Sequence, residues 1–117
     1  MSDTFKGYKR EHLLSIFRLM ATSRRMDEKM LTLLRQGKSF FHIGAAGHEG
    51  AQLACALNMK PGFDWAYPYY RDQALMLGLG ATVDEIFLGF LAKRDDPSSG
   101  GRQMPQHYGS KALNIVS

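Results

Sequence analysis

Residues 11–36, EHLLSIFRLMATSRRMDEKMLTLLRQ, decide the fold class of this chain. Apolar side chains recur there at steps of three and four residues, and charged side chains occupy most of the positions between them. This spacing places the apolar side chains on one helical face, and Gly37 follows where a left-handed C-cap residue is wanted. The stretch predicts a long helix, part of whose apolar face is expected to pack on something outside the chain. That face consists of Leu13, Phe17, Met20, Met26, Met30, Leu33 and Leu34.

Three shorter helices are predicted further along the chain. Residues 49–57 are small and apolar nearly all round, which favours a buried helix packed closely through its alanines. Residues 73–79 form a second apolar stretch that ends before a glycine. Residues 83–93 form the third, which begins with Thr82 and Glu85 at the spacing of a capping box.

The remaining segments lack helical periodicity. Residues 65–70 are aromatic and are predicted to be extended, with their proline at a strand edge or end. Residues 94–111 contain two prolines and three glycines and predict a long loop, a feature that is usually functional or disordered. Residues 112–117 are predicted to begin a strand, which suggests that the sequence is part of a larger protein.

The composition is that of one globular domain of 117 residues, with 44% hydrophobic and 22% charged residues. The net charge is 15 − 11 = +4, but the basic residues are dispersed, so no nucleic-acid partner is expected. No apolar run approaches the roughly 20 residues that span a bilayer, so no membrane partner is expected either. The polar first ten residues lack a signal core and predict a cytoplasmic location. The single cysteine, Cys55, excludes an internal disulfide and is expected in the core.

The stretch Tyr69-Tyr-Arg-Asp72 is the first candidate site. An arginine at the junction of an extended segment and a helix can bind an anion together with free N–H groups, and tyrosine hydroxyls can add hydrogen bonds. The alternative is a surface arginine paired with Asp72. The local pattern alone favours this alternative, because the stretch has no fixed glycine spacing.

Two further segments could contact a ligand. Residues 40–49 combine small residues with His42, His48 and Glu49, but the histidine spacing matches no zinc site, and structural roles are favoured for His48 and Glu49. Residues 100–109 resemble a ligand-contacting loop, and the alternative is a mobile surface connection.

Five short motifs follow one another along the chain in a specific order. They are Arg35-Gln-Gly, Ala46-Gly-His-Glu49, Pro61-Gly-Phe-Asp-Trp65, Tyr69-Tyr-Arg-Asp72 and Gly101-Arg-Gln-Met-Pro-Gln-His107. Over roughly residues 10–117 the chain thereby resembles the N-terminal part of the alpha chains of thiamine-diphosphate-dependent 2-oxo acid dehydrogenases. These are the decarboxylating components of multienzyme complexes. The last motif is similar to the branched-chain, 2-oxoisovalerate branch of that family.

This resemblance implies a set of site residues. Tyr69, Tyr70 and Arg71 match the segment that contacts the cofactor diphosphate. The resemblance leaves the catalytic residues unassigned and places no metal ligand in this chain. The substrate pocket is implied to include Phe41, Tyr70, Met104 and His107.

The resemblance also implies a fold, an activity and partners. The fold is α/β: residues 1–9 form a polar arm, and residues 10–117 form an incomplete, mostly helical part of a thiamine-diphosphate-binding domain whose parallel sheet lies mainly beyond the chain end. The activity is oxidative decarboxylation of a branched-chain 2-oxo acid with acyl transfer to a lipoyl group. The implied partners are a beta chain or beta-like domain in an alpha2–beta2 assembly and a lipoyl acyltransferase core. The Gly-Asp-Gly motif that holds Mg²⁺ is absent from these 117 residues, so the metal ligands are expected elsewhere and this piece alone is expected to be inactive.

Two other functions are compatible with the sequence. A non-catalytic helical interaction module would use the apolar face of residues 11–36 as its binding surface. A general phosphate-binding domain would use Arg71 alone.

Overall fold

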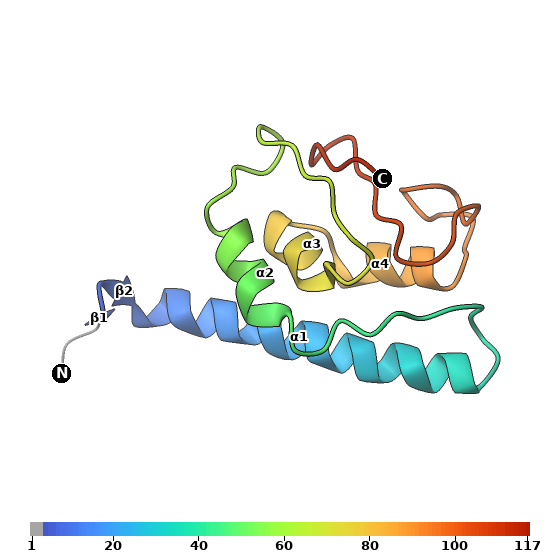
Figure 1. Ribbon diagram of the computed structural model, residues 1–117, viewed down its shortest axis with the longest axis horizontal. Helices are drawn as coiled ribbons and strands as arrows, with labels where there is room; N and C mark the ends of the chain where they lie inside the picture. Colours follow the sequence, from blue (N-terminus) through green and yellow to red (C-terminus); the bar gives the residue numbers. More distant parts are fainter. Residues whose placement is uncertain (1–3) are drawn as a thin grey trace.

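The computed structural model describes residues 4–117, so residues 1–3 of the predicted polar arm lie outside the described residues. One long helix lies along one side of the molecule, and three short helices pack above its central and C-terminal parts (Figure 1). No helix within the described range is both long and apolar enough to cross a membrane. In chain order the elements are β1 (Thr4–Phe5), β2 (Tyr8–Lys9), α1 (Arg10–Arg35), α2 (Glu49–Ala56), α3 (Gln73–Leu79) and α4 (Val83–Phe90).

Helix α1 confirms the long helix predicted over residues 11–36. It ends as expected, because Gly37 adopts a φ of +70° and the N–H of Lys38 donates to the Leu33 carbonyl at 3.0 Å. Its middle is buried against α2 and α3, whereas its first turns extend past the other helices (Figure 1), and Phe17 is 65% exposed. Part of the apolar face is therefore uncovered, as the sequence predicted.

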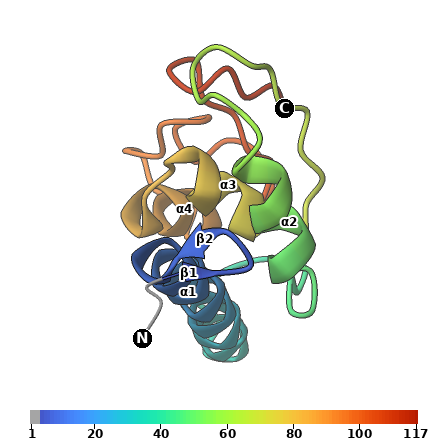
Figure 2. The same cartoon turned by 90° about the vertical axis from the view of Figure 1, so that its left-hand side faces the viewer.

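Within residues 4–9 of the predicted polar arm, β1 and β2 pair as an antiparallel hairpin. Lys6 and Gly7 form the turn with φ values of 47° and 85°. Two consecutive positive φ values are typical of the tight turns that match the twist of a hairpin. Figure 2 shows this hairpin at the N-terminal end of α1.

Helix α2 packs on α3 through small residues. A Cβ at Gly78 would lie only 2.5 Å from the Ala56 Cβ, so a glycine is needed for this approach. The predicted close packing through an alanine is confirmed at Ala56, but the helix is buried on one face only, and the predicted core position of Cys55 was wrong, because Cys55 is exposed. Only one face of this eight-residue helix meets α1 and α3, and the other face is left to solvent.

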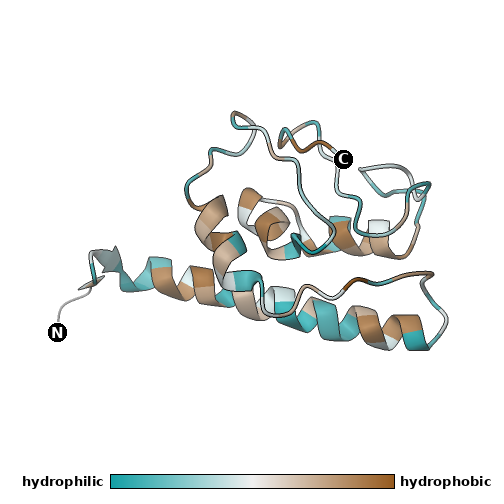
Figure 3. Cartoon of the chain, viewed as in Figure 1, coloured by the Kyte–Doolittle hydropathy of each residue, from teal (hydrophilic) through white to brown (hydrophobic). Residues whose placement is uncertain are grey.

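Helices α3 and α4 have the predicted starting points. Gly80 ends α3 with a φ of 109°, and Thr82 begins α4 with the predicted capping box. Helix α4 ends at Phe90 rather than at residue 93, because Ala92 adopts a φ of 50° and breaks the helical path. Figure 3 shows that α3 is almost entirely apolar, in keeping with its central place in the core.

The strand predicted over residues 112–117 was wrong. Residues 112–114 form a turn, and within the segment only Ile115 forms bridges, a parallel one to Ala66 and an antiparallel one to Ser110. Residues 65–70 are extended as predicted, but they take part in a single bridge only. The described residues are thus mostly helical, and the parallel sheet stays a prediction.

Candidate anion- and substrate-binding site

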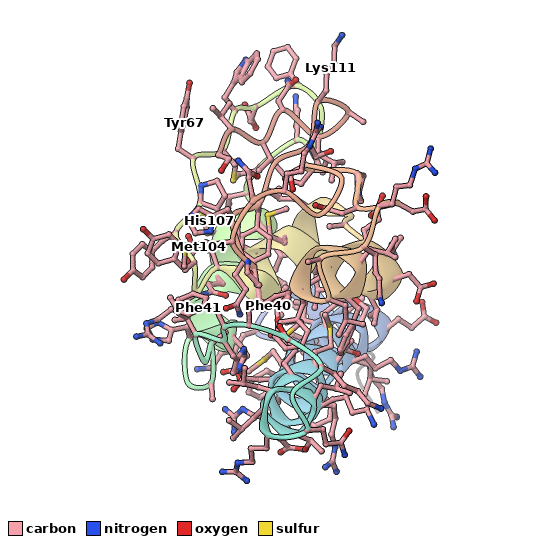
Figure 4. The ribbon with its side chains drawn as sticks, turned by 90° about the vertical axis from the view of Figure 1, so that its right-hand side faces the viewer. Phe40, Phe41, Tyr67, Met104, His107 and Lys111 are labelled. Atoms are coloured by element: carbon pink, nitrogen blue, oxygen red, sulfur yellow. The ribbon has the colours of Figure 1, made fainter. Side chains whose placement is uncertain are left out.

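Three segments far apart in the sequence meet above the C-terminal half of α1: residues 39–48, 69–72 and 104–108. The side chain of Gln106 bonds to the backbone of Ile43, which joins the first segment to the third. Figure 4 shows Phe41, Met104 and His107 on the same side of the molecule, with Lys111 well apart from them. The structure therefore brings the sequence-predicted site residues into one region.

Arg71 lies at the junction of the extended segment and α3, as the sequence predicted. One of its guanidinium nitrogens, Nη1, donates to the Gly44 carbonyl at 2.6 Å, and its own carbonyl accepts from Gln52 Nε2 at 2.8 Å. Among residues 4–117 it forms no ion pair with a carboxylate. The half-buried guanidinium is thus held in place with most of its donors unused, which suits an anion.

The alternative of a surface arginine paired with Asp72 was wrong. The Asp72 carboxylate instead accepts hydrogen bonds from the Tyr69 N–H at 2.7 Å and from Gln52 Nε2 at 3.2 Å. Gln52 also accepts from the N–H of Ala74 at 3.0 Å. These contacts fix the backbone on both sides of Arg71 and leave its guanidinium without a paired carboxylate among the described residues.

The aromatic rings of Tyr69, Tyr70 and His107 form a row. Ring centroids are 4.6 Å apart between the two tyrosines and 4.9 Å apart between Tyr70 and His107. His107 Nδ1 lies 3.1 Å from the Met104 carbonyl, and since a carbonyl can only accept, Nδ1 carries a proton. In the neutral imidazole, Nε2 is then the nitrogen that can accept a proton or a hydrogen bond.

Tyr108 ties the segment of residues 104–108 to the segment of residues 69–72. Its hydroxyl donates to the Tyr70 carbonyl at 3.4 Å, and the side chain is buried. Burial raises the pKa of Tyr108 far above its ordinary value, and the nearby carboxylates of Asp72 and Asp27 act in the same direction. The hydroxyl therefore stays protonated and serves as a hydrogen-bond donor.

The two apolar residues predicted for the substrate pocket differ in exposure. Phe41 is half-buried, whereas Met104 is 56% exposed. A cavity of about 50 Å³ lies beneath the same loop, between Ile86, Gly89 and Tyr108. It has room for a few water molecules only.

Of the two histidines in residues 40–49, His42 has a structural partner, and the ring of His48 forms no hydrogen bond with residues 4–117. His42 is buried, with Nε2 3.1 Å from Asp27 Oδ1, and the same oxygen accepts from the Ala45 N–H at 2.9 Å. His48 is exposed at the start of α2. No group of three or more histidine, cysteine or acidic side chains that could hold a metal ion occurs within the described range.

Glu49 has the structural role that the sequence favoured. Its carboxylate accepts from Arg24 at 2.7 and 3.2 Å and from the Gly47 N–H at 2.8 Å. The hydrogen bond from Arg24 is the main reason that the pKa of Glu49 is lowered. This pair ties the start of α2 to α1.

Sequence reasoning missed the residues that hold the site together: Gln52, Gln106 and Asp27. Each bonds to backbone at least 18 residues away along the chain. No local pattern marks such a residue, because a glutamine on a helix or in a loop is usually solvated. Burial of the side chain, which only the fold reveals, is the signal that would have found them.

Comparison with known proteins places the chain in a family. A family model described as dehydrogenase E1 component matches residues 17–117. The chain is 39% identical over 111 residues to the 2-oxoisovalerate dehydrogenase subunit alpha of Bacillus subtilis, covering 95% of this chain and 34% of that protein. It is 34% identical over 116 residues to the mitochondrial 2-oxoisovalerate dehydrogenase subunit alpha 2 of Arabidopsis thaliana, covering 99% and 24%. The chain belongs to the dehydrogenase E1 component family.

Relatives of the pyruvate type are also found. The pyruvate dehydrogenase E1 component subunit alpha of Mycoplasma genitalium is 31% identical over 106 residues, covering 91% of this chain and 28% of that protein. The resemblance to alpha chains of 2-oxo acid dehydrogenases is confirmed by these relatives. The chain spans about a third or less of the length of the curated relatives that it matches.

Proposed function

We propose that this chain is the part of a 2-oxo acid dehydrogenase alpha subunit that binds the diphosphate of thiamine diphosphate and forms one wall of the substrate pocket. The proposed activity of the whole enzyme is oxidative decarboxylation of a branched-chain 2-oxo acid with acyl transfer to a lipoyl group. When bound, thiamine diphosphate supplies an electron sink for the decarboxylation. The proposed role of the residues of this chain is to bind and orient the cofactor and the substrate.

The observation that carries the proposal is the uncompensated charge of Arg71. Its guanidinium is held by the Gly44 carbonyl alone, with no carboxylate paired to it among the described residues. A guanidinium fork can bind phosphate oxygens through two parallel hydrogen bonds. We propose that Tyr69 and Tyr70, which precede it and are partly exposed, add neutral hydrogen bonds to the same anion.

The substrate side of the site is assigned to four residues. Apolar surface from Phe41 and Met104 suits a branched aliphatic side chain, and the ring of Tyr70 stacks between those of Tyr69 and His107. An apolar wall discriminates only modestly against a chain that is one methylene shorter. His107 Nε2 is the polar atom of this wall that we propose to face the substrate.

The other parts of the active site are proposed to come from outside these residues. No carboxylate cluster that could hold Mg²⁺ occurs among residues 4–117. We propose that the ligands of Mg²⁺ lie elsewhere in the subunit and that a beta chain in an alpha2–beta2 assembly completes the site. A lipoyl acyltransferase core is the proposed acyl acceptor, and the 117 residues alone are proposed to be inactive.

Titration of thiamine diphosphate into the full-length enzyme, assembled with its beta chain, tests the proposal. Arg71→Ala is expected to raise the dissociation constant roughly 10- to 100-fold, because one or two charged hydrogen bonds are lost. Arg71→Lys is expected to recover part of this loss, since an ammonium keeps the charge without the fork. Tyr70→Phe is expected to cost about 1 kcal/mol, the value of one neutral hydrogen bond.

The matched control is Arg18→Ala, which removes an exposed arginine of α1 that lies outside the three site segments. It is expected to leave cofactor affinity unchanged. An Arg71→Ala enzyme with wild-type affinity for thiamine diphosphate would contradict the proposal.

A second candidate function rests on a groove between α1 and α4. Its lining includes Phe17, which is 65% exposed, and Val83, which is 38% exposed. Such a surface favours an interaction module with the same fold and no catalysis. Phe17→Asp would then abolish partner binding in a protein that neither binds thiamine diphosphate nor decarboxylates a 2-oxo acid.

A further inference from the structure

Gln106 makes an unusual connection in the site. Its Oε1 accepts from the N–H of Ile43 at 2.7 Å, and its Nε2 donates to the carbonyl of the same residue at 2.9 Å. The side chain therefore satisfies both the N–H and the carbonyl of Ile43, as the backbone of a neighbouring strand would. Gln106 is 5% exposed, and both hydrogen bonds are partly buried.

The backbone of Gln106 is also unusual. Its φ is 67°, in the left-handed region that a residue with a side chain rarely adopts. The contacts of the two flanking residues do not involve the side chain at position 106: Pro105 is buried, and His107 stacks on Tyr70. A strained backbone persists only where the surrounding contacts enforce it, and such residues cluster at functional sites.

Gln106 is the connection between the two walls of the proposed pocket. Among the described residues, its two hydrogen bonds are the only ones that join residues 39–48 to residues 94–111. Each wall is otherwise anchored separately. Asp27 holds Ala45 on one side, and the hydroxyl of Tyr108 holds the loop to Tyr70 on the other.

We infer that Gln106 is a positioning residue that sets the separation between Phe41 and the loop carrying Met104 and His107. That separation determines which side-chain lengths of a 2-oxo acid fit between the walls. The inference rests on the proposed function, because it assigns Gln106 to the pocket of that enzyme. It adds a selectivity role for a residue that touches no substrate atom.

The first test removes both hydrogen bonds and keeps the length of the side chain. In the full-length enzyme with its beta chain, Gln106→Met is compared with wild type for carbon dioxide release from 2-oxoisovalerate and from pyruvate. The expected result is a fall of about 10-fold in the ratio of the two kcat/KM values, with KM for 2-oxoisovalerate raised and kcat changed less. Gln103→Met is the matched control, because Gln103 is an exposed glutamine of the same loop whose side chain accepts a hydrogen bond from the Ser98 hydroxyl and makes no hydrogen bond to residues 39–48.

The second test uses Gln106→Glu. A carboxylate can accept from the Ile43 N–H but cannot donate to the Ile43 carbonyl, whereas the protonated acid can do both. The selectivity of this variant is therefore expected to recover toward the wild-type ratio as the pH is lowered. The hydroxyl of Tyr108 and the ring of His107 lie close to position 106 in every variant, so the wild-type pH profile is the reference.

The outcomes separate the two ideas. A wild-type enzyme that releases carbon dioxide from neither substrate would overturn the proposed function. An active wild type whose substrate ratio is unchanged in Gln106→Met, or changed equally in Gln103→Met, would overturn the inference alone. A lower melting temperature with an unchanged ratio would show a structural role and overturn it too. If Gln106→Met does not fold, Gln106→Glu decides the inference instead. A ratio of kcat/KM values that does not change with pH in that variant would overturn the inference.

Discussion

The helical core and the irregular segments of the site are held together by different interactions. In the core, Met30 and Phe90 are at most 1% exposed and are surrounded by apolar side chains from several elements. In the irregular segments, single polar side chains such as Asp27, Asp96 and Gln106 hold the backbone. Stability in the core is thus distributed over many contacts, whereas the geometry of the site depends on a few residues. Point substitutions should affect the two regions differently.

The largest effect is expected in the core. Phe90→Ala should lower the free energy of unfolding by about 3–5 kcal/mol, because it leaves a cavity beside Phe87 and His42. Urea denaturation followed by circular dichroism measures this change. Phe40→Ala, at a side chain that is 85% exposed, is the control and should change the value by less than about 0.5 kcal/mol. Equal effects of the two substitutions would contradict the placement of the core.

A smaller and more local effect is expected at Asp96. This carboxylate accepts from the N–H groups of Ser98, Ser99 and Gly101 at 3.0–3.2 Å and from the Ser99 hydroxyl at 2.8 Å. Burial raises the pKa of Asp96, but these hydrogen bonds outweigh it, and the pKa is lowered overall. Asp96→Ala leaves the N–H groups without an acceptor and should destabilise the loop by about 2 kcal/mol.

Hydrogen exchange resolves that prediction by region. Amides of residues 98–101 should exchange faster in Asp96→Ala, while those in the middle of α1 should keep their wild-type rates. Asp95→Ala, at the exposed neighbouring position, is the control. Faster exchange of amides throughout the protein would contradict the prediction, because it would show that the substitution destabilises the core as well as the loop.

The link between α1 and α2 should respond to pH. The hydrogen bond from Arg24 lowers the pKa of Glu49 in the folded state, so the unfolded state binds more protons as the pH falls below about 5. The stabilisation by this pair is therefore present above the unfolded pKa and is lost as the pH falls through the folded pKa. Urea midpoints between pH 7 and pH 3 should show a shallower acid dependence in Glu49→Gln than in wild type. The effect should be modest because Arg24 is half exposed.

Glu11→Gln is the control for that measurement, since Glu11 is exposed in the first turn of α1. Its acid dependence should match that of wild type. A Glu49→Gln curve parallel to the wild-type curve would exclude the pair as a source of acid sensitivity.

The smallest effect is expected at the start of α4. The Thr82 hydroxyl accepts from the Glu85 N–H at 3.1 Å, and the Glu85 carboxylate accepts from the Thr82 N–H at 2.8 Å. Thr82→Ala should lower the free energy of unfolding by about 1 kcal/mol, whereas Thr82→Ser should be near wild type. A serine variant as unstable as the alanine variant would show that the capping hydrogen bond is not the cause.

The sequence by itself determined the local structure. The boundaries of α1 and α3, the capping box of α4 and the positive φ values at Gly37 and Gly80 follow from side-chain periodicity and from conformational preferences of single residues. These signals lie within a few residues of the element that they specify. The family was also readable from the order of short motifs, and the comparisons confirm it.

Only the tertiary structure decided how the site is assembled. The hydrogen bond from Arg71 to the Gly44 carbonyl joins residues 27 positions apart, and the pair from Gln106 to Ile43 joins residues 63 positions apart. Cys55 faces solvent because its helix has neighbours on one side only. These contacts depend on which surfaces meet when the helices pack. The residue spacing within one segment does not show which residue of another segment will bond to it.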